Sequence, residues 1–172
     1  MSLITLEQYK DYKGITNPSK DNEYTTVIES INALIKSYCN RTFTDFFSNN
    51  KVEAFVAKEG QTVITLKEIP IVQLVSVTED GEDITSEVTW SSDYGFVNYA
   101  FTGGKTVEVT YKGGTENTPA DIKLAALELT DYYIKDEHKQ KRTFGNSTIE
   151  YFEVGNEWPL HIQYILNAHR DL

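Results

Sequence analysis

The amino-acid sequence predicts an α+β fold, in which a small helical bundle carries a β-rich excursion between its second helix and its long third helix. Near both ends of the chain, apolar residues recur every three or four positions, as on one face of a helix. Between residues 51 and 112, apolar residues instead alternate with polar ones in short runs separated by glycine. Because the β-type runs are grouped together, an alternating parallel α/β sheet is not expected.

Two helices are predicted before the β-rich region. Thr5 and Gln8 have the spacing of a capping box, and Gly14 is placed to end the helix that they start. The second helix, over residues 24–38, carries an apolar stripe made of Tyr24, Val27, Ile28, Ile31, Leu34, Ile35 and Tyr38. Arg41 follows that helix, and its guanidinium is a candidate helix cap for the last free carbonyls, the alternative being a solvated arginine.

Short strands are predicted between the second and third helices, at residues 52–57, 63–66, 71–78, 87–90, 96–99 and 106–111. Between Lys67 and Lys105 the chain carries seven acids and no Lys or Arg. Four of these acids flank Gly81 in a predicted surface hairpin turn, namely Glu79, Asp80, Glu82 and Asp83.

The third helix is predicted from residue 119 to residue 135. Gly113 and Gly114 end the preceding strand, Thr118 is the expected N-cap and Pro119 the expected first helical residue. The apolar stripe of this helix comprises Ile122, Ala125, Ala126, Leu129, Tyr132 and Tyr133.

The remaining sequence predicts a C-terminal tail over residues 143–172, beyond a domain that spans residues 1–142. The tail contains a candidate strand at 148–152 and a short helix that begins at Pro159. Aromatic side chains are enriched where proteins meet partners. Four aromatic residues of the tail are therefore candidate docking or interface residues, the alternative being that they fill a core: Phe144, Tyr151, Phe152 and Trp158.

Composition excludes several classes of protein. The net charge of −10 argues against tight DNA binding, which needs Lys and Arg to replace phosphate counterions. The longest apolar run, residues 69–75, is too short to span a bilayer, so no membrane partner is expected. The single cysteine, Cys39, cannot form an internal disulfide and is expected to be a buried thiol within the second helix.

No pattern in the sequence supports an enzyme, a cofactor or a metal site. Gly104-Lys105-Thr106 resembles the end of a phosphate-binding loop, but Tyr99 stands where that loop needs glycine. The acidic turn lacks the ligand spacing of a calcium loop, which favours a solvated turn over an adventitious cation in an oligomer. His161 and His169 are eight residues apart and are expected on different faces of the last helix.

The run VTYKGGTENTPADIKLAALELTDYY, at residues 109–133, resembles a segment of the head–tail connector (adaptor) proteins of tailed bacteriophages. The resemblance extends in order and spacing over residues 3–136. It includes a short first helix at 3–15, a second helix that ends in Arg-Thr-Phe at 41–43, and a strand that begins near Pro70 and leads to an acidic turn.

The resemblance implies a structural protein of the virion neck, present in the host cytoplasm during assembly. Family members form a ring, usually dodecameric, between the portal protein and a stopper or tail-completion protein, and DNA passes through it without being tightly bound. The acids of the turn are then candidates to face the DNA channel or a basic partner surface, the alternative being a turn that faces bulk solvent. The alternative is a small β-rich recognition module for a carbohydrate or a host surface protein, although the helix–β–helix order counts against it.

Overall fold

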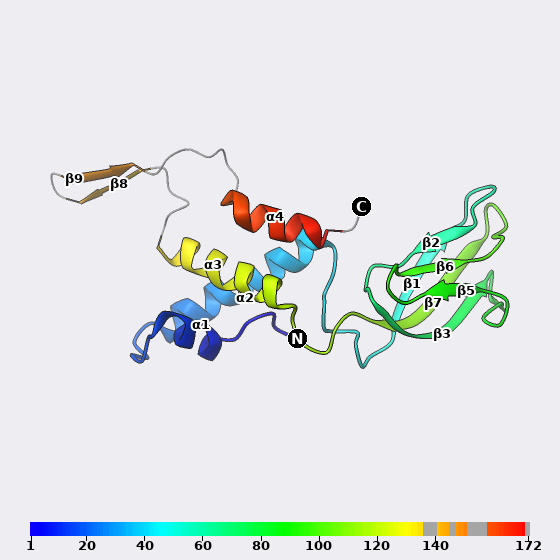
Figure 1. Cartoon of the computed structure of the whole chain (residues 1–172), viewed down its shortest axis with the longest axis horizontal. Coiled ribbons are helices and arrows are strands. Elements are labelled where there is room, and N and C mark those ends of the chain that lie inside the picture. The colour runs from blue at the N-terminus through cyan, green and yellow to red at the C-terminus, as the bar shows by residue number, and fades with distance from the viewer. Residues whose placement is uncertain (136–140, 145–146, 151–157, 171–172) are drawn as a thin grey trace. The chain divides into compact units, whose positions relative to one another are not determined.

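The computed structural model of the protein describes residues 1–135, 141–144, 147–150 and 158–170 (Figure 1). It confirms the α+β prediction, since helices precede and follow a group of strands that lies between α2 and α3. The elements are α1 (Leu6–Lys13), α2 (Asp21–Cys39), β1 (Lys51–Val56), β2 (Val63–Thr65), β3 (Ile71–Glu79), β4 (Glu82–Asp83), β5 (Thr89–Ser91), β6 (Phe96–Asn98), β7 (Thr106–Gly113), α3 (Ala120–Ile134), β8 (Lys141–Phe144), β9 (Ser147–Glu150) and α4 (Leu160–Ala168).

The chain divides into two compact units, which we call the β unit and the helical unit. The β unit comprises Arg41–Thr118 together with Met1, and the helical unit comprises Ser2–Asn40 and Pro119–Leu172. The helical unit is therefore built from two separate stretches of sequence, and the β unit is inserted between them.

The β unit contains two antiparallel sheets. One has the strand order β1-β7-β3-β4, and the other has the order β2-β6-β5. Alternate residues of β7 point inward, where Val107, Val109 and Tyr111 are completely buried. They join a core that also contains Ala57, Ile64, Leu66, Ile71, Val77, Ile84, Val97 and Phe101.

The helical unit contains the predicted apolar stripes. Thr5 and Gln8 form the expected capping box at the start of α1, and Gly14 ends that helix with a positive φ of 66°. The α2 and α3 helices pack against each other, and Cys39 is buried as predicted. The helices of this unit bury residues that include Ile28, Ile31, Ile35, Ile122, Ala125, Ala126 and Leu129.

Three helices begin at other residues than predicted, among them α4, which begins at Leu160 with Pro159 in the N-cap position. The α2 helix begins at Asp21, before the first residue of its apolar stripe. The α3 helix begins at Ala120, with Pro119 in the N-cap position and no side-chain cap, so the N-cap prediction for Thr118 is wrong. Pro119 has the extended ψ of 140°, and this conformation places it just outside the helix.

The last helix lies within the helical unit. The α4 helix packs against α2 and α3, and its Ile162 and Leu166 side chains are almost completely buried. The hydroxyl of Tyr38 also donates a hydrogen bond of 2.7 Å to Asn167 Oδ1. Over the described residues, no helix combines the length and the hydropathy that crossing a membrane requires.

Candidate functional site in the β unit and the predicted docking residues

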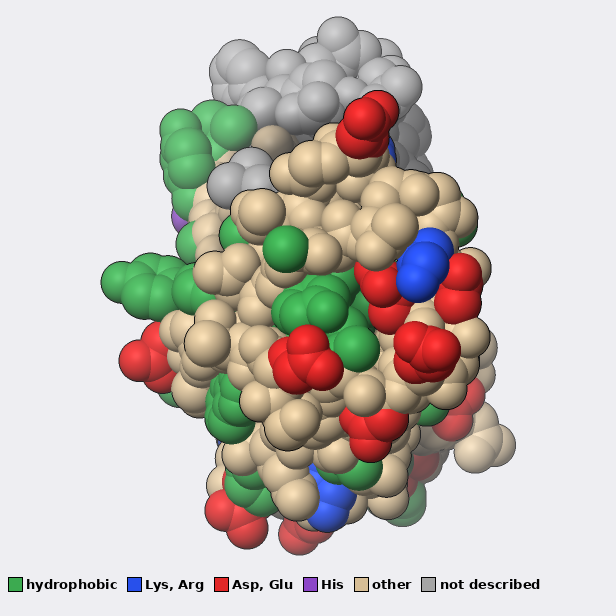
Figure 2. Space-filling model, turned by 90° about the vertical axis from the view of Figure 1, so that its right-hand side faces the viewer, with side chains coloured by type: hydrophobic (Ala, Val, Ile, Leu, Met, Phe, Trp, Pro, Cys, Tyr) green, Lys and Arg blue, Asp and Glu red, His purple; other side chains and the backbone are tan. Residues whose placement is uncertain are grey.

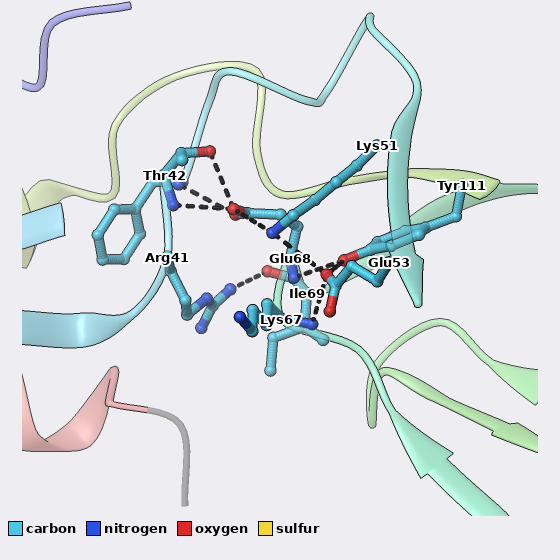
Figure 3. Close-up of polar contacts among 9 residues, drawn as sticks. Arg41, Thr42, Lys51, Glu53, Lys67, Glu68, Ile69 and Tyr111 are labelled. Carbon is cyan, nitrogen blue, oxygen red and sulfur yellow. Dashed lines mark hydrogen bonds and ion pairs between the residues drawn. The ribbon is translucent and has the colours of Figure 1, made fainter. Parts of the chain in front are cut away.

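Glu68 is the centre of a buried polar cluster in the β unit (Figure 3). Its side chain is 0% exposed. Oε1 accepts hydrogen bonds from the backbone N–H of Thr42 at 2.9 Å, from the Thr42 hydroxyl at 3.0 Å and from Lys51 Nζ at 3.1 Å. Oε2 accepts a further bond from the N–H of Phe43 at 3.2 Å. A buried carboxylate with this many donors is compensated for its lost hydration.

Tyr111 connects Glu68 to a second buried acid, Glu53. The N–H of Glu68 donates to the Tyr111 hydroxyl at 3.0 Å, and that hydroxyl donates to Glu53 Oε1. Glu53 also pairs with Lys51 at 3.2 Å and accepts from the N–H of Lys67 at 3.2 Å. Burial, followed by the hydrogen bond to Glu53, raises the pKa of Tyr111 well above its ordinary value, so the phenol keeps the proton that it donates. We call Thr42, Lys51, Glu53, Glu68 and Tyr111 the Glu68 cluster.

Gly113 and Gly114 lie so close to the backbone of Glu68 and Phe43 that no side chain could occupy their positions. A Cβ on Gly113 would lie 2.2 Å from the carbonyl oxygen of Glu68. A Cβ on Gly114 would lie 2.2 Å from the carbonyl oxygen of Phe43, and Gly114 has a φ of +93°. The close approach permits backbone hydrogen bonds from Gly114 N to Pro70 O at 2.9 Å and from Thr115 N to Phe43 O at 2.8 Å.

The cluster brings together three segments that are far apart in the sequence. Residues 41–43, residues 68–70 and residues 111–114 each belong to the resemblance described above, and they meet at this one place. These are the segments where the chain enters the β unit, turns into β3 and leaves the unit. The polar groups of the cluster are occupied by one another, so the arrangement holds backbone segments together and offers no free nucleophile or general base.

Arg41 lies beside this cluster, and its contacts differ from those predicted. Its Nη2 donates to the carbonyl oxygen of Ile69, and its guanidinium lies 5.4 Å from the centre of the Phe43 ring. The α2 helix is instead ended by Asn40, which has a positive φ of 52° and donates its N–H to carbonyls of the last turn. Because Arg41 is 8% exposed, it is neither a solvated arginine nor, in its described contacts, a cap of α2.

The predicted acidic turn joins β3 and β4 through Asp80 and Gly81, both of which have positive φ. Glu79 is buried, with 6% exposed, and accepts hydrogen bonds from Thr102 N at 2.7 Å and from Lys105 Nζ at 3.3 Å. The Thr102 N–H, aided by the Thr102 hydroxyl and Lys105, lowers the pKa of Glu79 against the opposing effect of burial.

The other acids of the turn are exposed. Asp80 Oδ1 accepts from Thr106 N at 2.8 Å, and Asp83 Oδ1 accepts from Thr85 N at 2.8 Å. Hydrogen bonds from the hydroxyl and then the N–H of Thr85 lower the pKa of Asp83. The Glu82 carboxylate accepts no hydrogen bond within the described part of the chain. Figure 2 shows the resulting surface of the β unit, where Asp and Glu side chains lie around a hydrophobic patch and outnumber Lys and Arg.

The predicted docking aromatics fall into three groups. Trp158 is half-buried in the helical unit, where its ring lies 5.0 Å from that of Tyr38 and its Nε1 is 3.4 Å from the Tyr133 hydroxyl. Phe144 pairs with Ser147 in the β8–β9 hairpin. Tyr151 and Phe152 lie outside the described residues.

The two histidines of the last helix both reach α3, so the prediction that they lie on different faces is wrong. His161 Nε2 is 2.7 Å from Glu128 Oε2, and His169 Nε2 is 2.6 Å from Asp121 Oδ2. Eight residues advance a helix by two turns plus only about 80°, which long side chains can bridge. Across the described ranges, no group of three or more His, Cys, Asp or Glu residues has the arrangement of a metal site.

Comparisons with known proteins agree with the resemblance read from the sequence. A family model described as Head completion protein matches residues 2–172. The Head completion protein of Escherichia phage T5 is 27% identical over 173 residues, which cover 99% of both chains.

Solved structures share the fold. A chain from the neck of an empty GTA particle computed with C6 symmetry has a TM-score of 0.59 at 12% identity, covering 99% of this chain and 90% of that one. A chain from the neck of a native GTA particle computed with C12 symmetry has a TM-score of 0.55 at 15% identity, covering 89% and 88%. A chain from the virion of a native gene transfer agent particle gives 0.59 at 13% identity, covering 99% and 90%. Since the family match extends over nearly the whole sequence, including both structural units, the chain belongs to the head completion protein family.

Proposed function

We propose that the protein is a ring-forming adaptor of the virion neck, placed between the portal protein and the next neck component around the DNA exit channel. The observation that carries this proposal is the family match over residues 2–172, which spans the helical unit and the β unit together. The shared fold with chains of GTA necks, which were computed with C6 and C12 symmetry, supports a cyclic assembly. A closed ring requires two different surfaces on each copy, because each copy contacts one neighbour on either side.

The charge of the β unit is consistent with passage of DNA. Every charged residue between Lys67 and Lys105 is an acid. Among these acids, Asp80, Glu82, Asp83 and Glu87 are exposed. Repeated around a ring, such a surface would repel phosphate and keep DNA from binding tightly. The competing use of the same acids is contact with a basic partner surface, which would speed docking and fix its orientation.

Glu82 offers the sharpest way to separate these two uses. Glu82→Gln removes an exposed charge without removing any described hydrogen bond, whereas a change at Glu79 would also disturb Thr102 and Lys105. A channel role predicts normal assembly with altered DNA retention or ejection. A partner role predicts slower neck assembly that has become less sensitive to salt.

The adaptor role itself is tested by deletion and by co-assembly. A phage that lacks this chain should build filled heads that lose DNA and do not acquire the rest of the neck. The purified protein should form a stable complex with the cognate portal ring. Electron microscopy would show the symmetry of that complex. Infectious particles without the chain, or a protein that never binds the portal, would refute the proposal.

The tail is the second surface that the proposal uses. Phe144, Tyr151 and Phe152 are proposed to contact a neighbouring copy or the portal. Truncation after Arg142 also removes α4, whose Ile162 and Leu166 are buried, and could therefore unfold the helical unit. The triple change of these aromatics to Ser tests docking more cleanly, because it leaves α4 in place. Normal incorporation of that variant into necks would show that these aromatics are dispensable.

A further inference from the structure

Within the described part of the chain, the β1 strand has an open edge with unpaired backbone groups. Among those residues it pairs with β7 on one side alone and is the end strand of its sheet. The N–H of Ala57 donates to Lys105 O, and the N–H of Asp80 donates to Thr106 O on the other side of β7. The direction of the backbone hydrogen bonds alternates along an antiparallel strand. The N–H and C=O groups of Phe55, Glu53 and Lys51 therefore point toward β7. The N–H and C=O groups of Val52, Ala54 and Val56 therefore point away from the sheet.

The second half of this edge lacks the usual protection against pairing with another strand. Edge strands are commonly protected by charged side chains, Pro, bulges or inward-pointing charges, and β1 carries such charges at Lys51 and Glu53, in its first half only. Here the outward positions are Val52, which is 55% exposed, Ala54, which is also exposed, and Val56, which is 68% exposed. The β1 ladder with β7 has no bulge, because its register runs without a shift from Lys51 to Val56.

A second element of the chain has the complementary need. The β8 and β9 strands form a two-stranded sheet, which we call the arm, with Lys141 opposite Glu150 and Phe144 opposite Ser147. A hairpin of two strands is marginally stable by itself in water and needs a third strand or other packing. Each strand of the arm has four residues, about 14 Å at 3.4 Å per residue, and β1 has six residues, about 20 Å, so either arm strand fits along β1.

Charge also favours this match. The arm begins with Lys141 and Arg142, in a protein whose net charge is −10. Next to the open edge, Glu108 is exposed and lies opposite Ala54 in the β1–β7 register. Glu59 is also exposed just beyond the end of β1, but it follows the exposed Lys58, and the arm carries Glu150 opposite Lys141. Glu108 is therefore the charge beside the edge that can orient the basic start of the arm along β1.

We propose that the arm of one copy adds as a further strand to the β1 edge of the neighbouring copy. The contact joins two different surfaces, so it repeats from copy to copy and is suited to closing a ring. Main-chain hydrogen bonds would supply the affinity, as in other cases of strand addition. This inference rests on the proposed ring function and names the surfaces that would build the ring.

Disulfide trapping in assembled particles tests the contact directly. The variants are Ala54→Cys combined with Thr143→Cys, and Ala54→Cys combined with Thr148→Cys, which place thiols on β1 and on the middle of either arm strand. Cys39 is buried, so it supplies little background reaction. After particles are purified and oxidised, one of the two pairs should give a ladder of covalent multimers, whereas each single variant should not.

Every other outcome argues against the contact. Particles that contain the variants but give no ladder with either pair would overturn it and leave the adaptor role standing. A crosslink within one chain, or to a different neck protein, would show that β1 has another occupant. If even the single variants and the unchanged protein were missing from particles, the adaptor role would be the part that failed.

Proline variants provide an independent test with a matched control. Ala54→Pro removes an N–H that points out of the sheet, so β1 should still pair with β7 while strand addition is blocked. Thr65→Pro is the control, because Thr65 is exposed on the edge strand β2 and its N–H also points away from its partner strand, β6. Ala54→Pro should reduce incorporation into necks at least tenfold, and Thr65→Pro should not. Circular dichroism would confirm that both variants are folded, and equal incorporation of folded variants would refute the proposal.

Discussion

The β unit and the helical unit are stabilised in different ways. Over the described residues, all the buried charged side chains lie in the β unit, namely Arg41, Glu53, Glu68 and Glu79. Among its described residues, the helical unit buries apolar side chains with only Asn32 and Thr130 as polar additions. Its ion pairs, such as Lys13 with Asp131 at 3.0 Å, lie at partly exposed positions.

Because of this difference, the stability of the two units should respond differently to small changes of side chains. An apolar stripe depends mainly on volume and area, and it tolerates swaps that conserve both. A buried charge depends on specific donors at specific distances, and removing one partner leaves the others uncompensated. We therefore expect the β unit to be sensitive to changes of a few atoms that the helical unit would tolerate. The two tryptophans allow this to be measured, because Trp90 lies in β5 and Trp158 lies against Tyr38 in the helical unit.

Glu68→Ala should have the largest effect. The change leaves two buried backbone N–H groups without their acceptor and leaves Lys51 with Glu53 alone, which should cost about 3–5 kcal/mol of unfolding free energy. Urea denaturation followed through Trp90, in a Trp158→Phe background, would measure it. The reciprocal variant Leu129→Ala, at a completely buried α3 position, should act through Trp158 instead. Equal shifts of both signals in both variants would show that the two units unfold as one.

Gly114→Ala should have the next largest effect. Both the positive φ and the 2.2 Å approach to the Phe43 carbonyl oppose a side chain, and together they should cost about 2–4 kcal/mol. Gly104→Ala separates these causes, because Gly104 has a φ of +84° but no atom within 4 Å of its would-be Cβ. A similar denaturation midpoint for the two variants would mean that Gly114 is needed because of its positive φ alone, and not because of its close approach to the Phe43 carbonyl.

Tyr111→Phe should lower the stability of the β unit by about 1–3 kcal/mol. It removes one hydroxyl and leaves the N–H of Glu68 and the carboxylate of Glu53 with one partner fewer in a buried place. Tyr99→Phe is the matched control, since the Tyr99 hydroxyl bonds Glu87 at an exposed site. Should the Tyr111 variant be as stable as the Tyr99 variant, the Glu68 cluster would not act as a connected network.

The smallest expected effect is a dependence of β-unit stability on acid. The Thr102 N–H and Lys105 hold the pKa of Glu79 below the value of 4.5 that is normal for glutamate. The stabilisation is therefore complete above that normal value and is lost as pH falls through the lower folded-state value. Denaturation midpoints between pH 6 and pH 3 should fall less steeply in Glu79→Gln than in the parent. Glu82→Gln, which loses no described bond, is the control, and a parent-like slope in Glu79→Gln would contradict the assignment.

Local patterns made much of the fold predictable. The Thr5–Gln8 capping box depends on residues three apart, and the apolar stripes of α2 and α3 depend on single helices. The same locality explains the error at Thr118, because a good N-cap residue was available but Pro119 fixed the start of the helix one position later.

The Glu68 cluster could not be predicted from local pattern. Glu68 belongs to an acid-only stretch that predicts exposure, and its burial depends on Thr42 and Lys51, which are distant in sequence. The predicted surface position of Glu79 is wrong for the same reason, since the donors that accompany its burial lie at Thr102 and Lys105. The double glycine was recognised as a chain break, but its close approach to Phe43 and Glu68 is visible only in three dimensions. Glu68 lies two residues after Leu66, in step with the alternation of Ile64 and Leu66, and directly before Ile69-Pro70, and this spacing is the one sequence signal of its burial.

The backbone bond from Thr115 to Phe43 has a consequence for how this family can diversify. It closes the inserted unit at its two ends, so the separation between those ends does not depend on what the chain does between them. Strands can lengthen, loops can be exchanged and surface charge can drift without altering the points at which α2 passes into the insertion and α3 resumes from it. We therefore expect the β unit to tolerate replacement of most of its sequence. The residues that must be kept are the few at its two ends, such as Phe43 and Thr115.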